Sequence, residues 1–460
     1  MPTSRLEVDL AAIQRNLGIL RQALDAPPAT AAAAAQTATT HHKIRVCGVV
    51  KQEAYGLGAA RVAKKLASLG VDALAVYCLD EAQALADLPI TTPLMVLMPV
   101  RSIERHDPVY RLAVRGRLHL TVHDLAQVND LAATAGRLGT KLPVHVQLDT
   151  GMGRGGAMAD EATQIVQAVA NNPRLTLAGV MTHFSSPGHD DAFTREQAKS
   201  FRTWIDGVKP ILAATPGVTI HAANTCGTLR ARNLHASMVR VGQGLYGYGF
   251  ESFTDPLAVE FAALGKQLQP AVRWVSRIVH IHEIPKGWPV GYNRTFKASK
   301  PTRVALIPVG YADGYPSGLS NQAKVVLTGL SWDRPKAGMG EAPEPAKNVL
   351  APVIGRVSMD QITIDVSGLP ESVARVGAEV ELIGREPQGP NHLPTLAKQA
   401  NLITHELLCR VCPHIERVYV SPAGTDEPIV DATAPLPGLG RSQVVQPGRL
   451  GLPRQSIAAA

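Results

Sequence analysis

The sequence predicts an α/β fold: an N-terminal (β/α)8 barrel of the TIM type followed by a mostly β domain. Eight apolar, strand-like runs alternate with helical segments through roughly the first 250 residues, which is typical of a closed parallel barrel. After about Leu264 the alternation stops, and strand-like runs follow one another without helices between them. An open, doubly wound sheet is the alternative for the first half of the chain.

The expected barrel strands are short runs in which most residues are apolar, as in strands buried on both faces. The clearest helix between them spans Asp190–Leu212, where Phe201, Trp204 and Val208 fall on one face after an acidic start. We expect a barrel domain over residues 1–264, with an Ala-rich insertion at 26–40. The strands span residues 44–51, 73–77, 94–98, 119–122, 143–149, 177–184, 218–224 and 238–247.

The second domain is expected over residues 265–421, where the apolar runs resemble those of an antiparallel sheet. Composition alone marks two further segments as loops or disorder: the Gly/Pro-rich stretch 331–348 and the Pro/Gly-rich tail 422–460. The expected strands of the second domain span residues 271–284, 303–309, 324–327, 353–357, 361–366 and 379–383.

The composition is that of a globular protein with a sizeable core. Hydrophobic residues make up 45% and charged residues 18% of the 460 positions, which excludes disorder along the whole chain. No apolar run reaches the ~18 residues of a membrane helix, and the N-terminus lacks the apolar segment of a secretory signal. Five dilute cysteines suggest a reducing compartment. We therefore expect a soluble cytoplasmic protein.

The net charge of +8 is spread over the chain without a long basic run. The densest basic stretch, residues 101–117, also contains Glu104 and Asp107. We interpret it as a solvated helix face rather than a nucleic-acid-binding patch. The basic excess indicates a mild preference for small anions.

The residue that ends the first expected strand is Lys51. In barrels of this kind, functional groups sit at the carboxyl ends of the strands. A lysine at such an apolar strand end is desolvated, which lowers its pKa and makes the neutral amine available as a Schiff-base nucleophile. Tyr55, Gly56 and Gly58 then open the next helix. The alternative is a lysine that only extends from the strand end into solvent.

Polar groups also follow the later strands. The glycine-rich loop 149–156, with Arg154 at its centre, offers backbone amides that suit a phosphate. A lysine, phosphate-site glycines, a histidine and an arginine at one barrel mouth favour pyridoxal phosphate bound through the lysine. The other groups at strand ends are His183, Asn224, Thr225, Arg240, Gly242 and Gly244.

With these motifs in this order, the chain resembles the fold-type III pyridoxal-phosphate enzymes, specifically the alanine racemase family, over residues 4–421. The resemblance implies that Lys51 carries the cofactor, and that Tyr55, Thr225 and the backbone of Gly242 and Gln243 hold its phosphate. The motifs are VVKQEAYGLG (49–58), LDTGMGRGG (148–156), THF (182–184), HAANT (221–225), MVRVGQGLYG (238–247), GYNRTF (291–296), PVGYADG (308–314) and GRVSMDQ (355–361).

The resemblance also implies roles for the rest of the barrel mouth. His183 is expected to pack beside the cofactor ring, with Asn224 also at the cofactor, and Arg240 is expected to face the pyridine nitrogen. A permanently charged guanidinium there disfavours protonation of that nitrogen, which weakens the electron sink and limits side reactions. Arg154 and the amide of Met359 are expected to bind the substrate carboxylate.

A racemase needs acid/base groups on both faces of the reacting carbon. By resemblance, Lys51 serves one face, and Tyr292 serves the other across a homodimer interface, with Tyr311 lining the entrance. The expected activity is interconversion of L- and D-alanine, supplying D-alanine for peptidoglycan. The alternatives are a serine or broad-specificity racemase, a non-catalytic pyridoxal-phosphate-binding protein, and a fold-type III decarboxylase.

Two positions depart from the family pattern. Gln147 stands where many members have a carbamylated lysine, so we predict either a chloride beside Arg154 or a direct Gln147–Arg154 hydrogen bond. Pro413 stands where relatives often have a tyrosine, which leaves the substrate range open. His405, Cys409, Cys412 and His414 have a metal-like spacing, but a lone CxxC is weak evidence and we predict no metal site.

Overall fold

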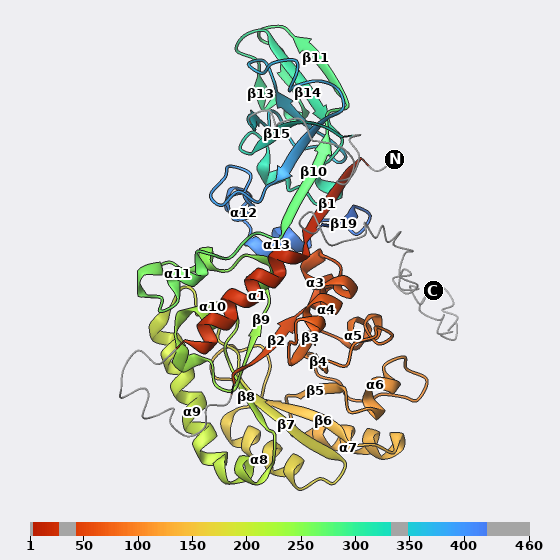
Figure 1. Ribbon diagram of the computed structural model, residues 1–460, viewed down its shortest axis with the longest axis vertical. Coiled ribbons are helices and arrows are strands. Elements are labelled where there is room, and N and C mark those ends of the chain that lie inside the picture. The colour runs from red at the N-terminus through yellow and green to blue at the C-terminus, as the bar shows by residue number, and fades with distance from the viewer. Residues whose placement is uncertain (1–2, 27–42, 333–347, 421–460) are drawn as a thin grey trace, which may run out of the picture. The chain divides into compact units, whose positions relative to one another are not determined.

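The computed structural model describes residues 3–26, 43–332 and 348–420 (Figure 1). The expected insertion at 26–40 and the stretch 331–348 lie almost wholly outside these residues. The expected tail at 422–460 lies entirely outside them.

Eight parallel strands close into the predicted barrel, which excludes an open sheet. The ring closes where the first strand pairs with the last, with Cys47 opposite Arg240. Most strand residues are buried, as the apolar runs predict. The strands are β2 (Arg45–Val49), β3 (Ala73–Val76), β4 (Leu94–Val96), β5 (Leu118–Val122), β6 (Leu142–Gln147), β7 (Leu175–Met181), β8 (Thr219–His221) and β9 (Met238–Val241).

Helices surround the barrel strands (Figure 1). The predicted helix at Asp190–Leu212 is α9, and the carboxylate of Asp190 caps it by accepting from the amide of Phe193. The helices are α1 (Leu10–Asp25), α3 (Lys51–Gly56), α4 (Ala59–Ser68), α5 (Leu79–Ala84), α6 (Tyr110–Val114), α7 (Leu125–Leu138), α8 (Ala159–Ala170), α9 (Asp191–Ala214), α10 (Thr225–Arg230) and α11 (Ala262–Gly265).

Within the basic stretch 101–117, only α6 is helical. The prediction that this stretch forms a solvated helix face is therefore wrong for most of its residues. No helix among the described residues is long and apolar enough to span a membrane.

The region after the barrel is mostly β, as predicted. It contains a six-stranded sheet in the order β16-β15-β18-β10-β1-β19, a three-stranded sheet β11-β14-β17 and a two-stranded ribbon β12-β13. The strands are β1 (Ser4–Asp9), β10 (Val272–Arg277), β11 (His280–Ile284), β12 (Pro289–Val290), β13 (Phe296–Lys297), β14 (Thr302–Ile307), β15 (Lys324–Ser331), β16 (Val349–Pro352), β17 (Ile362–Asp365), β18 (Ala378–Ile383) and β19 (Glu416–Val420).

Three details of this region differ from the sequence-based expectation. The first strand of the chain, β1, pairs with β10 and β19. The run at 271–284 is two strands rather than one. The strand expected at 353–357 is wrong: β16 ends at Pro352, and Gly355 takes a left-handed conformation with φ 75°, which is incompatible with a continuous strand. Two short helices, α12 (Leu393–Gln399) and α13 (Thr404–Cys409), precede β19.

Candidate active site

Lys51 directly follows the first barrel strand, at the carboxyl end where the sequence places it. Its side chain is half-buried. Burial lowers the pKa of Lys51, the positive charge of Arg154 lowers it further, and the negative charge of Glu81 opposes both. The amine is therefore neutral more readily than an exposed lysine, as predicted from its position.

The chain after Lys51 makes a left-handed turn instead of opening an ordinary helix. Residues 52–55 all have positive φ, between 51° and 62°, although none is glycine. Such a backbone costs roughly 1–2 kcal/mol per residue, and strain of this kind clusters at functional sites. Contacts with Glu81 and Glu53 hold it: the amide of Gln52 donates to Glu81 (2.9 Å), and the amide of Ala59 to the Glu53 carboxylate (3.0 Å).

The turn brings Tyr55 against the segment that follows β9, the strand paired with β2. Its ring packs on Tyr246 with centroids 5.1 Å apart and on His405 with centroids 6.3 Å apart. Its hydroxyl lies against Gly242, so closely that a side chain at that position would collide with it. The hydroxyl of Tyr246 donates to the carbonyl of Val49 (2.8 Å), which ties this aromatic pair to the strand before Lys51.

Thr225 faces the same spot from the start of α10. Its hydroxyl oxygen accepts from the amides of Gly242 (3.3 Å) and Gly244 (3.2 Å). Asn224 caps α10 by accepting from the amide of Gly227 (3.0 Å). Gln243 lies between the two glycines. Two hydroxyl groups and a turn of backbone amides therefore gather in one place. The amides of Gly242 and Gly244 are engaged only by the neutral Thr225 hydroxyl, at 3.3 and 3.2 Å, so a charged phosphate oxygen would be the better acceptor.

The glycine-rich loop after β6 does not take part in such a cradle, so the prediction that its amides suit a phosphate is wrong. The carboxylate of Asp149 already accepts from the amides of Gly151 (2.9 Å), Met152 (2.8 Å) and Gly153 (2.9 Å). The loop instead presents Arg154, whose side chain is exposed.

The side chain of Gln147 contacts a backbone carbonyl of this loop. Its side-chain amide donates to the carbonyl of Gly155 (2.7 Å), rather than to Arg154 as predicted. The prediction of a direct hydrogen bond between Gln147 and Arg154 is therefore wrong. The chloride expected beside Arg154 stays a prediction. Gln147 holds the position of the loop, and Arg154 stays free to bind an anion.

Arg240 is buried in the barrel, and every contact the structure gives its guanidinium is with a neutral acceptor. One nitrogen donates to Nδ1 of His221 (2.9 Å), and the other to the carbonyl of Thr182 (2.8 Å) and to Nδ1 of His183 (3.0 Å). Among the described residues, no carboxylate pairs with it. Burial lowers the pKa of Arg240, Cys47 opposes this and Arg154 adds to it, and together they bring the pKa to about 10.

The contact with His221 continues through the barrel as a chain of histidines, which sequence reasoning did not find. Nε2 of His221 lies 2.9 Å from Nδ1 of His145, and Nε2 of His145 lies 2.9 Å from Nδ1 of His119. Because a guanidinium only donates, each Nδ1 in the chain accepts and each Nε2 carries the proton. Burial lowers the pKa of all three, that of His119 to about 4, which keeps the chain neutral.

His183 lies beside Arg240 at the barrel mouth. Burial, together with the positive charges of Arg240, Arg154 and Lys51, lowers the pKa of His183 to about 3. The ring is therefore neutral, and its Nδ1 accepts from Arg240. A neutral aromatic ring held at a fixed angle suits contact with a flat ligand.

The C-terminal segment packs on the left-handed turn, which the sequence did not predict. Arg417 donates to the carbonyl of Gly56 (3.0 Å) and Tyr419 to that of Leu57 (3.0 Å). His405 contacts the Tyr55 ring, and Cys409 lies close enough to Lys51 for their charges to interact. The turn that carries Lys51 is thus supported by residues more than 350 positions later.

The residues with metal-like spacing have separate surroundings. His414 pairs with Asp313 (2.8 Å), the thiol of Cys412 donates to the carbonyl of Ala312 (2.9 Å), and His405 faces Tyr55. Within the described ranges, no group of three or more His, Cys, Asp or Glu side chains is arranged to hold a metal ion.

Three predicted site residues belong to the β region: Tyr292 and Tyr311 each begin a short 3-10 helix, and Met359 lies between β16 and β17. Tyr292, Tyr311 and Met359 are 71%, 49% and 54% exposed. The amide of Tyr311 donates to Ser358 (3.0 Å) and that of Ala312 to Met359 (3.0 Å), so Tyr311 and Met359 are neighbours. In the described part of the chain, no hydrogen bond or ion pair joins these three side chains to Lys51.

Comparison with known proteins agrees with this geometry. Residues 8–249 match the family model for the alanine racemase N-terminal domain, and residues 271–419 match that for the C-terminal domain. An alanine racemase of Halothermothrix orenii is 30% identical over 419 residues, which cover 91% of this chain and 97% of the relative.

Two solved structures are also similar. Alanine racemase of Clostridium difficile 630 has a TM-score of 0.75 and 26% identity, covering 93% of this chain and 98% of that one. The Bartonella henselae alanine racemase, which has covalently bound pyridoxal phosphate, has a TM-score of 0.68 and 24% identity, covering 91% and 100%. The chain therefore belongs to the alanine racemase family of isomerases.

Proposed function

We propose that this protein interconverts L- and D-alanine with pyridoxal 5'-phosphate as cofactor, using Lys51 and the Tyr292 of a second copy as its two acid/base groups. The observation that carries the proposal is the barrel mouth, where a lysine of lowered pKa, a buried guanidinium with neutral partners and a cradle of hydroxyls and amides converge. Membership of the alanine racemase family supports the choice of substrate.

The residues of the barrel mouth fit this cofactor. Tyr55 and Thr225, with the backbone of Gly242 and Gln243, would hold its phosphate, because their polar groups face one point where side chains beyond glycine would not fit. His183 would lie beside the ring and Arg240 at its nitrogen. Pyridoxal phosphate, when bound, withdraws electrons from the substrate and so acidifies the proton on its α-carbon.

The role of Lys51 follows from its environment. A general base acts best when its pKa lies near the working pH, and burial together with Arg154 moves the pKa of Lys51 in that direction. Lys51 would remove or return the α-proton on one face. Arg154, exposed at the mouth, would hold the substrate carboxylate with the amide of Met359, because a guanidinium binds carboxylate oxygens in a fixed plane.

The second face needs a group that a single chain does not bring to Lys51. Tyr292 is the proposed group, and its 71% exposure leaves the side chain available to another molecule. The neighbouring exposed side chains of Tyr311 and Met359 would line the same contact. The active site is then shared in a homodimer, and each β region completes the barrel of its partner.

The proposal includes a cytoplasmic enzyme that supplies D-alanine for peptidoglycan. All five cysteines are free, which agrees with a reducing compartment. A reducing compartment would therefore break no disulfide among these five cysteines.

The test is to incubate L-alanine with the holoenzyme in D₂O, following deuterium at the α-carbon together with optical rotation. We expect deuterium incorporation to accompany the loss of rotation. Exchange with retained configuration, or release of CO₂, would contradict a racemase. The same assay with serine and lysine measures the substrate range that Pro413 leaves open, since a broad-specificity enzyme would give similar kcat/KM values for all three.

A further inference from the structure

A group of three arginines lies outside the active site, in the basic stretch between β4 and β5. Two nearby arginines are paired with carboxylates: Arg101 with Asp124 (2.7 Å), and Arg137 with Glu104 (3.1 Å). Arg111, Arg115 and Arg117 differ, because within the described residues none of them forms an ion pair. Among the residues that the structure describes, no ion pair therefore balances the charge of this group.

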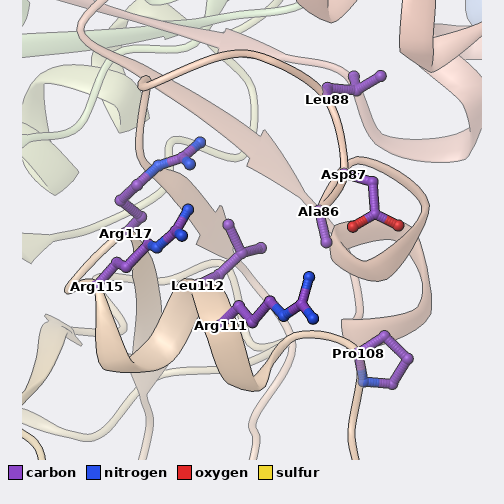
Figure 2. A pocket seen from close by; sticks show the side chains of 8 residues that line it. All are labelled: Ala86, Asp87, Leu88, Pro108, Arg111, Leu112, Arg115 and Arg117. Carbon is purple, nitrogen blue, oxygen red and sulfur yellow. The ribbon is translucent and has the colours of Figure 1, made fainter.

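The three side chains line a cavity of about 180 Å³ (Figure 2). This volume has room for roughly six water molecules at ~30 Å³ each, which suits a small ion better than a nucleotide. Arg115 and Arg117 lie side by side, and Asp87 and Leu88 lie on the other wall of the cavity. The lining residues are Ala86, Asp87, Leu88, Pro108, Arg111, Leu112, Arg115 and Arg117.

Arg117 has unused hydrogen-bonding capacity at this cavity. Its Nε is buried and has no hydrogen-bond partner, and one terminal nitrogen reaches the carbonyl of Thr92 only at 3.5 Å. Burial lowers the pKa of Arg117, and the positive charge of Arg115 lowers it further. Because the Nε is closed off from solvent, an anion in the cavity would contact the terminal nitrogens of this guanidinium and of the one beside it.

We propose that this cavity binds a small polyvalent oxyanion of the phosphate class. Planar guanidinium groups bind phosphate oxygens in pairs. Asp87 is the only carboxylate among the lining residues, so the site keeps a net charge of two positive units. Phosphate and pyrophosphate share this chemistry, and the experiment below compares them.

The place of the cavity in the fold determines what binding would do. Arg117 directly precedes β5, and its carbonyl accepts from the first residue of β4, so the cavity lies at the amino ends of these strands. Lys51 lies at the carboxyl end of β2, which is the opposite end of the barrel. An anion here would stabilise the folded barrel by linkage and leave the kinetic constants unchanged.

The test uses the holoenzyme saturated with pyridoxal phosphate, so that the phosphate cradle near Tyr55 is filled. Phosphate and pyrophosphate are titrated separately by calorimetry at constant ionic strength, and the melting temperature and the kinetics for alanine are measured with each. We expect binding of both, tighter for pyrophosphate, and a rise in melting temperature without a change in KM or kcat. Absence of binding to the wild-type protein would refute the proposal.

Variants locate the site. The double variant Arg115→Gln/Arg117→Gln should bind pyrophosphate at least tenfold more weakly, whereas Arg202→Gln, at an exposed arginine of α9, should bind it as the wild type does. Equal binding by the double variant would overturn the assignment. Asp87→Asn keeps all three arginines and removes the opposing charge, so it should tighten binding roughly two- to fivefold. Unchanged or weaker binding by Asp87→Asn would count against the site even if the double variant does not fold.

Discussion

Replacing Gly244 with alanine tests the cradle that we assign to the cofactor phosphate. A Cβ at Gly244 would lie 2.6 Å from Cγ2 of Thr225, well inside ordinary van der Waals contact. Thr225 is buried and β-branched, so it cannot rotate freely to relieve the contact. Overpacking of this kind costs ~1–3 kcal/mol of folding free energy. A displaced Thr225 hydroxyl also loses a hydrogen bond to a charged group, ~1.5–3 kcal/mol, or roughly 10- to 100-fold in cofactor affinity.

The compensating variant makes this prediction specific. Thr225→Ser removes Cγ2 and keeps the hydroxyl, and the next contact of the new Cβ is then Oγ1 at 3.3 Å. The single change Thr225→Ser should cost ~1 kcal/mol and leave cofactor affinity within about twofold. Gly244→Ala/Thr225→Ser should therefore be more stable, and bind the cofactor more tightly, than Gly244→Ala alone.

The assays are urea unfolding of the apoprotein and fluorescence titration with pyridoxal phosphate. Gly207→Ala is the matched control, because a Cβ at this position of α9 meets nothing within 4 Å. It should be neutral or stabilise the protein by up to ~1 kcal/mol. The reasoning fails if Gly244→Ala behaves like Gly207→Ala, or if adding Thr225→Ser restores neither stability nor affinity.

Three further variants test other parts of the site. Arg240→Glu should raise transamination, measured as pyruvate formed per racemisation event, and unchanged partitioning would refute its proposed effect on the pyridine nitrogen. Tyr292→Phe should lower racemisation by ~10²–10⁴-fold. Alpha-proton exchange should persist for the enantiomer served by Lys51, and equal loss for both enantiomers would contradict two bases. Burial lowers the pKa of His119 from 6.5 to about 4, so the unfolded chain takes up this proton first and stability is lost as pH falls below 6.5. Between pH 7 and 5, His119→Gln should therefore lose ~2 kcal/mol less stability than the wild type in urea unfolding, and an equal loss would contradict this.

The barrel could be predicted because its signal is local. Each barrel strand is a short apolar run, and apart from the pair β2 and β9 that closes the ring, neighbouring strands of the barrel are also neighbours in sequence. The position of β1 could not be predicted, because its partners β10 and β19 follow more than 260 residues later. Arg5 of β1 pairs with the buried Glu379 (2.7 Å), a contact between residues 374 positions apart that no periodicity reveals.

The site could be predicted in part for the same reason. Lys51 could be predicted because an apolar run ends there in a charged residue. The left-handed turn after it could not be predicted, because residues 52–55 adopt positive φ without a glycine before Gly56. The loop after β6 was misread although a signal exists: an aspartate followed by glycines two and four positions later often accepts the amides of its own turn. The histidine chain needs His119, His145 and His221 on three different strands, so only the register of the barrel brings them together.

The charges at the barrel mouth connect binding with catalysis. Arg154 lowers the pKa of Lys51, of His183 and of Arg240, and Glu81 is the carboxylate that opposes it at Lys51. Under the proposed function, a substrate carboxylate on Arg154 neutralises much of this positive charge. The pKa of Lys51 then rises when substrate is present, which makes the amine more basic, while burial still keeps this pKa below that of an exposed lysine. Gln147 permits this because it holds the loop through Gly155 and places no negative charge beside Arg154, which leaves the guanidinium to be neutralised by substrate.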